Sequence, residues 1–139
     1  MSRTFENDLN FGLDNEKDFI PLIEQYIKGE YNILNTKDLY NDEYCYYDFE
    51  SPLSIFELKS RRNTKHKYPT TIIPKHKIIS TTKNHYLIFK FTDKICYIKY
   101  DNEKFKTFKT RYIKVNRTDK YDKPTLHYEI PINELIDFF

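Results

Sequence analysis

The segment that most constrains this chain is a pair of β-forming runs joined by a short turn. Residues 42–50 are rich in aromatic side chains, and within residues 53–61 apolar and charged side chains alternate from Phe56 to Lys59. A serine-proline pair between them is a turn signal, so we expect an antiparallel hairpin. Successive side chains of a strand point to opposite faces, so Glu57 and Lys59 should share one face. The hairpin would bring Asp48 beside Glu57.

A helix is predicted before this hairpin. Either Asp14 or Asn15 is a plausible N-terminal cap, and acidic residues crowd the first turn, as the helix dipole favours. Gly29 should end the helix, because glycine is the common residue just beyond a helix C-terminus. Apolar residues recur between these limits at helical spacing: Phe19, Leu22, Ile23, Tyr26 and Ile27.

The remaining patterns predict a sheet with helices packed on it. We expect extended or irregular chain at 31–41, extended chain at 68–73, a second helix at 74–83, a hairpin of 85–91 and 95–101, one or two strands within 104–115, a strand at 126–131 and a terminal helix at 133–139. The segment at 74–83 begins with proline, which suits a first helical position, although its β-branched residues oppose a helix. The order of elements predicts an α/β or α+β fold in one domain, residues 1–139.

Composition excludes several classes of protein. The chain has two glycines, so it lacks a glycine-rich phosphate loop and a dinucleotide-binding fingerprint. No apolar run approaches the roughly 20 residues that span a bilayer. The first residues lack the apolar core of a signal peptide, which predicts an intracellular protein and no membrane partner. Cys45 and Cys96 have no CxxC neighbour, and we interpret them as two reduced thiols.

Charge divides the chain into two halves. Residues 1–58 carry 13 acidic and 4 basic side chains, whereas residues 59–139 carry 19 basic and 8 acidic ones. Nine Lys or Arg residues and no acid occupy residues 59–90. A single-sign run of this length repels itself unless a polyanion neutralises it. Guanidinium, amide, hydroxyl and aromatic groups are interleaved at 61–68, and this mixture suits contacts with nucleic acid.

The candidate phosphate-binding side chains all lie within this acid-free run. They are Arg61, Arg62, Lys65, Lys67, Lys75 and Lys77. A solvated basic face is the alternative interpretation.

Two carboxylates and an ammonium on one β surface indicate a metal site. Asp48 and Glu57 offer hard oxygen ligands, which Mg²⁺ or Mn²⁺ prefers. A metal held there lowers the pKa of bound water and stabilises charge on a phosphate. Lys59 is then placed to orient or deprotonate the water, or to stabilise the transition state. The alternative is an ordinary surface ion pair worth under about 1 kcal/mol.

This arrangement resembles the PD-(D/E)XK nuclease superfamily. Asp48 matches the first acid, and Glu57-Leu58-Lys59 matches the (D/E)XK triplet. Tyr47 stands where the named pattern has proline. The resemblance covers roughly residues 12–100 and implies a restriction-endonuclease-like α/β core, with a central mixed β-sheet flanked by helices.

The resemblance also implies further site residues. Many members carry another acid on the helix before the strands, and Glu16 is the natural candidate, with Glu24 as its rival. Members often carry a second lysine or glutamine after the active strands, for which Lys77 fits best and Lys75 next. The backbone carbonyl of Leu58 is an expected extra metal ligand. Small members commonly act as dimers, which implies a homodimer.

The predicted function is a Mg²⁺- or Mn²⁺-dependent endonuclease acting on DNA, with branched or structured DNA as one option. Asp48, Glu57 and Glu16 would hold the metal, and Lys59 would act on the water. The many residues with AT-rich codons suggest a phage, viral or bacterial source. Two alternatives stay open: a non-catalytic nucleic-acid-binding protein of nuclease-like fold, and a viral interaction protein.

Overall fold

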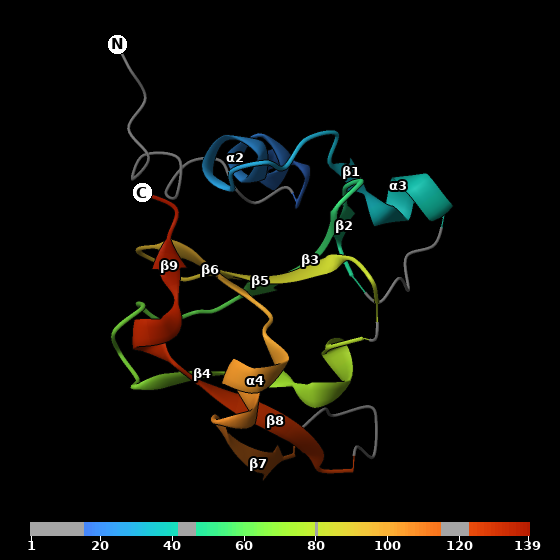
Figure 1. Cartoon of the computed structure of the whole chain (residues 1–139). Helices are drawn as coiled ribbons and strands as arrows, with labels where there is room; N and C mark the ends of the chain where they lie inside the picture. The colour runs from blue at the N-terminus through green and yellow to red at the C-terminus, as the bar shows by residue number, and fades with distance from the viewer. Residues whose placement is uncertain (1–15, 42–46, 80, 115–122) are drawn as a thin grey trace.

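A mixed six-stranded sheet, a second sheet of three strands and one helix form the layers of the protein (Figure 1). The computed structural model describes residues 16–41, 47–79, 81–114 and 123–139. The helices and 3-10 turns are η1 (Glu16–Asp18), α2 (Phe19–Tyr26), α3 (Thr36–Tyr40), η2 (Lys75–Lys77), α4 (Asn102–Lys106) and η3 (Ile132–Glu134). None of the described helices is long and apolar enough to cross a membrane.

The strands follow the order that the hairpin predictions require. They are β1 (Leu34–Asn35), β2 (Phe49–Glu50), β3 (Ser54–Ser60), β4 (Thr70–Pro74), β5 (Asn84–Lys90), β6 (Ile95–Lys99), β7 (Lys109–Ile113), β8 (Thr125–Pro131) and β9 (Ile136–Asp137). The large sheet has the order β1-β2-β3-β5-β6-β9, and the small sheet has the order β4-β8-β7. Strands β3 and β5 pair in parallel and the other neighbours pair antiparallel. The expected mixed central sheet is therefore confirmed.

Helix α2 covers one face of the large sheet (Figure 1). The predicted helical spacing is confirmed, since Phe19 and Ile23 are buried on the face that packs against the strands. Gly29 follows with φ of +88°, a conformation that costs glycine little and other residues more. The residues predicted to cap the helix, Asp14 and Asn15, lie outside the described residues. The buried residues beneath α2 are Phe19, Ile23, Ile27, Ile33, Phe49, Phe56, Tyr86, Ile88, Ile95 and Phe138.

The opposite face is covered by the small sheet, where the prediction placed helices. Strands β4, β8 and β7 lie below the large sheet in Figure 1, with α4 beside them. The buried residues between the sheets are Ile73, Leu87, Phe89, Phe91, Cys96, Ile98, Phe105, Phe108, Ile130, Ile132 and Leu135. The sheet is thus flanked by a helix on one side and by a second sheet on the other.

Both helices predicted at 74–83 and 133–139 are wrong. Only the 3-10 turn η2 forms in the first segment, because the β-branched pair Ile78 and Ile79 disfavours a helix, and an extended backbone follows the turn at Ile78. In the second segment, η3 gives way to β9, which pairs with β6. Burial of Leu135 and Phe138 in the two cores holds this segment extended.

Alternation along β3 is confirmed. Phe56 and the half-buried Leu58 pack in the core beneath α2. Glu57 and Lys59 consequently point to the other face, toward the small sheet. The path from β3 to β5 runs through β4 and η2, so these elements return to the same face on which Glu57 lies.

Candidate active site

Asp48 is placed by the start of strand β2. Phe49 pairs with Phe56, and the Asp48 backbone N–H donates to the Phe56 carbonyl at 2.8 Å. The Asp48 carboxylate also accepts a hydrogen bond from the Leu58 backbone N–H, with 2.7 Å between Oδ2 and N. The side chain therefore lies along β3 at the level of Glu57, as the hairpin predicts.

Glu57 is the centre of a charged cluster. Its side chain is buried, with 4% of the residue exposed. Glu57 Oε1 lies 3.4 Å from Lys59 Nζ and 3.7 Å from Lys77 Nζ. Lys59 comes from the same strand, whereas Lys77 comes from η2 at the end of β4. The turn at η2, and not the predicted helix, brings Lys77 to the carboxylate.

The electrostatics of the two acids reflect their crowding. Burial raises the pKa of Asp48 well above its usual value, and the nearby Glu57 and Glu16 carboxylates raise it further, while the Leu58 N–H opposes the shift. Burial also raises the pKa of Glu57, although the Lys77 and Lys59 ammonium groups act against this. Repulsion between buried carboxylates is the condition that a bound cation relieves.

Glu16 joins this cluster from η1. Its Oε2 accepts from Lys37 Nζ at 3.2 Å, whereas its Oε1 is buried without a hydrogen-bond partner in the described part of the chain. Glu16 and Asp48 interact closely enough to raise the pKa of Asp48. When both carboxylates are ionised, neither carries a hydrogen, so they cannot hydrogen-bond to each other and they repel. Glu24, the rival helix acid, is exposed on α2.

The donor set fits a hard divalent cation. Asp48 and Glu57 supply carboxylate oxygens, and the buried Glu16 oxygen needs a proton, a water or a cation. No group of three or more acid, histidine or cysteine side chains within the described ranges is close enough to hold a metal directly. Mg²⁺ is commonly held by one or two carboxylates and keeps several waters, so two ligands with Glu16 acting through water suit it.

Two of the predicted phosphate-binding residues are engaged within the fold. The Arg61 guanidinium donates to Thr71 Oγ1 at 3.3 Å and to the Ile72 carbonyl, which joins the end of β3 to β4. Lys65 is only 8% exposed, and its Nζ lies 2.6 Å from Asp137 Oδ1 on β9. These contacts give both cations a role in joining the elements of the fold.

The other predicted cations lie at the surface or in the site. Arg62, Lys67 and Lys75 are exposed. Lys67 lies over the Tyr68 ring and Lys75 over the Tyr128 ring, with 5.5 and 5.2 Å from Nζ to the ring centroids. Lys77 belongs to the Glu57 cluster instead. No described contact involves the Leu58 carbonyl as a ligand, so that assignment stays a prediction.

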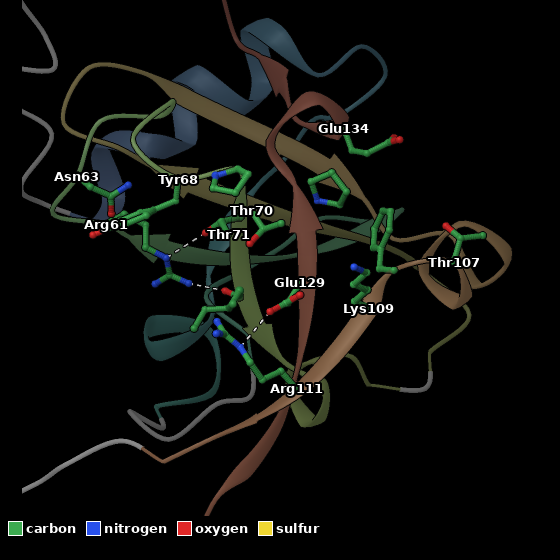
Figure 2. Close-up of a pocket in the computed structure, with 14 residues that line it drawn as sticks. Arg61, Asn63, Tyr68, Thr70, Thr71, Thr107, Lys109, Arg111, Glu129 and Glu134 are labelled. Atoms are coloured by element: carbon green, nitrogen blue, oxygen red, sulfur yellow. Dashed lines mark hydrogen bonds and ion pairs between the residues drawn. The ribbon is translucent and has the colours of Figure 1, made fainter.

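A large pocket lies beside the basic segment (Figure 2). Its volume is about 1020 Å³, and it extends from Arg61 and Tyr68 across β4 and β8 to β7. Figure 2 shows Arg61 directed at β4 and Arg111 paired with Glu129, whose Nε and Oε1 are 2.9 Å apart. The described residues that line this pocket include neither member of the carboxylate pair.

No role was predicted from the sequence for two histidines that the structure buries. His85 on β5 and His127 on β8 are each 4% exposed. Neither has metal-ligand spacing, so motif searching gives no signal for them. The alternation of β5 was the available signal, because it places His85 on the same side as Leu87, inside the sheet sandwich.

Comparison with known proteins agrees with this geometry. Residues 4–136 match the model of a family described as "Phage putative PDDEXK endonuclease". The chain belongs to this phage PD-(D/E)XK endonuclease family. Membership implies a restriction-endonuclease-like fold, which agrees with the mixed sheet, and an endonuclease that acts on DNA. No curated protein and no solved structure matches the chain.

Proposed function

We propose that this phage PD-(D/E)XK family member is a Mg²⁺- or Mn²⁺-dependent endonuclease that hydrolyses DNA phosphodiester bonds. The observation that carries the proposal is the buried Glu57, which lies between two lysine ammonium groups and beside Asp48. Burial of charged groups costs free energy, so a buried charged cluster of this kind indicates a functional task. The family and the donor chemistry both point to phosphodiester hydrolysis as that task.

Asp48 and Glu57 are the proposed metal ligands, and Glu16 would hold a metal-bound water. A divalent metal bound there would lower the pKa of its bound water and stabilise negative charge on the phosphate. The Leu58 N–H fixes the Asp48 carboxylate through their 2.7 Å hydrogen bond. The Leu58 carbonyl remains a proposed additional ligand.

Lys59 is the proposed group that acts on the attacking water. Its side chain is about one quarter exposed, as is that of Lys77, so both ammonium groups can reach a substrate phosphate. Lys77 would stabilise the charge that develops on the phosphate oxygens. In the free protein the two lysines share Glu57, and both ammonium groups would become available to a substrate phosphate if Glu57 bound a divalent cation instead.

The proposed DNA surface is the exposed part of the acid-free run. Arg62, Lys67 and Lys75 are its phosphate-binding members, and aromatic rings lie under two of them. Arg61 and Lys65 would act indirectly, by holding the β3–β4 connection in place. We also propose that the whole chain, 1–139, acts as one domain and as a homodimer, with one site for each DNA strand.

The test is cleavage of supercoiled plasmid, branched DNA and single-stranded DNA with Mg²⁺, Mn²⁺ or EDTA. Metal-dependent cleavage that disappears in Glu57→Gln and Lys59→Ala supports the endonuclease. Lys104→Ala is the matched control, because this lysine also pairs with an acid, Glu134, far from β3 in the chain. Binding of DNA without cleavage in either metal would instead support a non-catalytic nucleic-acid-binding protein. Neither binding nor cleavage at low salt would favour an interaction protein.

A further inference from the structure

The large pocket of Figure 2 is a groove across the outer face of the small sheet. The inner face of this sheet belongs to the core, because Ile73 of β4 and Ile130 of β8 are fully buried between the two sheets. Side chains alternate along a strand, so the neighbouring Ile72 and Glu129 point outward and line the groove. Register aligns Ile72, Glu129 and Lys109 in one row across β4, β8 and β7. The groove therefore crosses all three strands.

Positive charge is in excess on the β7 side of the groove. Both acids among the described lining residues are already paired, with Glu129 Oε1 2.9 Å from Arg111 Nε and Glu134 Oε2 3.1 Å from Lys104 Nζ. Lys109 is exposed and has no ion pair among the described residues. The Arg111 side chain is 59% exposed and pairs through Nε, so its two terminal amino groups can still donate to a ligand. This side of the groove therefore suits a polyanion.

Apolar and aromatic groups form the floor and the opposite rim of the groove. Ile72 and Pro131 supply half-buried apolar surface to the floor. Tyr68 stands at the rim opposite β7, with 53% of the residue exposed (Figure 2). Lys67 Nζ lies 5.5 Å from the centroid of this ring, and because Lys67 is exposed it can move to a phosphate when a base stacks there. Floor and rim therefore suit the faces of nucleobases.

Strand β3 leads from the proposed cleavage site to this groove. Glu57, Lys59 and Arg61 alternate to the same face of the strand, and each step of two residues spans roughly 7 Å. On that face the Arg61 guanidinium lies 5.6 Å from the centroid of the Phe89 ring and donates to Thr71 Oγ1 of β4. Arg61 also lines the groove. A DNA strand held at Lys59 can therefore continue past Arg61 into the groove.

We infer that this groove binds a single-stranded segment of DNA that continues from the strand at the proposed cleavage site. The inference rests on the proposed endonuclease function and narrows its substrate to DNA with a single-stranded arm, such as an overhang or a flap. A duplex keeps its base faces stacked inside and would leave the apolar floor without a partner, whereas a single strand exposes base faces and phosphates together. Lys109 and Arg111 contact phosphates, and Tyr68 stacks on a base.

The first test measures binding in EDTA, so that it does not depend on cleavage. Full-length protein is titrated into fluorescent blunt duplexes and into the same duplexes carrying single-stranded overhangs of either polarity and of increasing length. The wild type should bind one polarity of overhang more tightly than the blunt duplex. Equal affinity for the blunt duplex and for every overhang, or binding to none of these DNAs, would overturn the inference.

Two changes in the groove probe its aromatic rim and its cationic side. Tyr68→Ala should weaken binding of the overhang DNA at least about fivefold, the lower end for one lost base stack, whereas Tyr68→Phe keeps the ring and should bind as the wild type does. Lys109→Ala should reduce the slope of log affinity against log salt by about 0.7, the share of one phosphate on a single strand. Wild-type affinity and slope in both alanine variants would overturn the inference.

The matched control is Lys28→Ala. This lysine is also exposed without an ion pair among the described residues, and it follows α2, which covers the opposite face of the large sheet (Figure 1). Its salt slope should equal that of the wild type. Because every altered side chain is exposed, unchanged melting temperatures should separate loss of binding from loss of folding. An equal loss of slope in Lys28→Ala and Lys109→Ala would overturn the assignment to this groove.

The second test compares metal-dependent cleavage of the overhang DNA with cleavage of the blunt duplex. Wild-type preference for the overhang DNA should fall about fivefold in Tyr68→Ala, in step with the lost base stack. Cleavage of both DNAs without a preference that depends on Tyr68 would reject the single-strand groove and leave the endonuclease intact. Binding in EDTA that depends on Tyr68, without cleavage of any DNA, would reject the endonuclease and leave the groove intact.

Discussion

The two faces of strand β3 have opposite characters. On the α2 side, Phe56 is fully buried and its ring stacks on that of Tyr86, with 5.3 Å between centroids. On the other side, Glu57 is almost as deeply buried but faces two ammonium groups and the Asp48 carboxylate. Two adjacent residues of β3 thus differ in role: Phe56 stabilises the core beneath α2, whereas Glu57 belongs to a charged cluster on the opposite face.

This difference separates a stabilising face of β3 from a destabilising one. The α2 face is closed by apolar packing, which stabilises the sheet in proportion to the area buried. The opposite face holds carboxylates whose pKa values are raised by burial, so their ionised forms destabilise the metal-free protein. The proposed active site therefore lies on the face where burial and charge conflict, and changes to each face should have different consequences.

The largest expected effect is on catalysis. Glu57→Gln keeps the shape of the side chain but removes the charge that would hold a divalent metal. We expect the rate of DNA cleavage to fall at least about a hundredfold, the size of effect seen for a lost transition-state contact. Single-turnover cleavage in Mg²⁺ measures this. Cleavage at the wild-type rate would show that the polar face of β3 is not the active site.

The largest effect on stability should come from the apolar face. Phe56→Ala leaves a cavity beneath α2 and should lower the free energy of unfolding by about 3–5 kcal/mol. Chemical denaturation measures the loss. Leu58→Ala is the matched control on the same face, and because Leu58 is only half-buried its effect should be smaller. Equal losses at the two positions would contradict the asymmetric burial.

The sequence predicted the hairpin and its polar face because period-two alternation and a turn signal are local properties. It also predicted α2, whose buried residues recur at helical spacing. It failed at η2, where the β-branched pair Ile78 and Ile79 disfavours a helix, and at β9, where pairing with β6 and burial of Leu135 overrode a helical pattern. Pairing of Lys65 with Asp137 joins residues 72 positions apart, and no local pattern reports such a contact.

Asp48→Asn should stabilise the metal-free protein above neutral pH. The pKa of Asp48 is raised in the folded state, so wild-type stability falls as pH rises from the unfolded value of about 4 through the raised folded value. The variant lacks this titration and should gain about 1–2 kcal/mol at high pH, and less toward pH 4. Urea denaturation across this range measures it. A destabilised variant at high pH would contradict the assigned shift.

The smallest effect is expected for a surface cation. Lys67→Ala should weaken DNA binding and reduce the slope of log affinity against log salt by about 0.9, the contribution of one phosphate contact. Lys65→Met should instead lower protein stability, because Lys65 pairs with Asp137 inside the fold. Salt titrations of DNA binding by the folded variants separate these roles. An unchanged slope in Lys67→Ala would place the DNA surface elsewhere.

The central claim is that the polar face of β3 binds a divalent cation through Asp48 and Glu57. Titration of Mn²⁺, followed by the loss of its free-ion paramagnetic resonance signal, tests this claim without DNA or cleavage. The account predicts binding by the wild type and by Lys104→Ala, with strong loss in both Asp48→Asn and Glu57→Gln. Equal Mn²⁺ binding by all four proteins would contradict it.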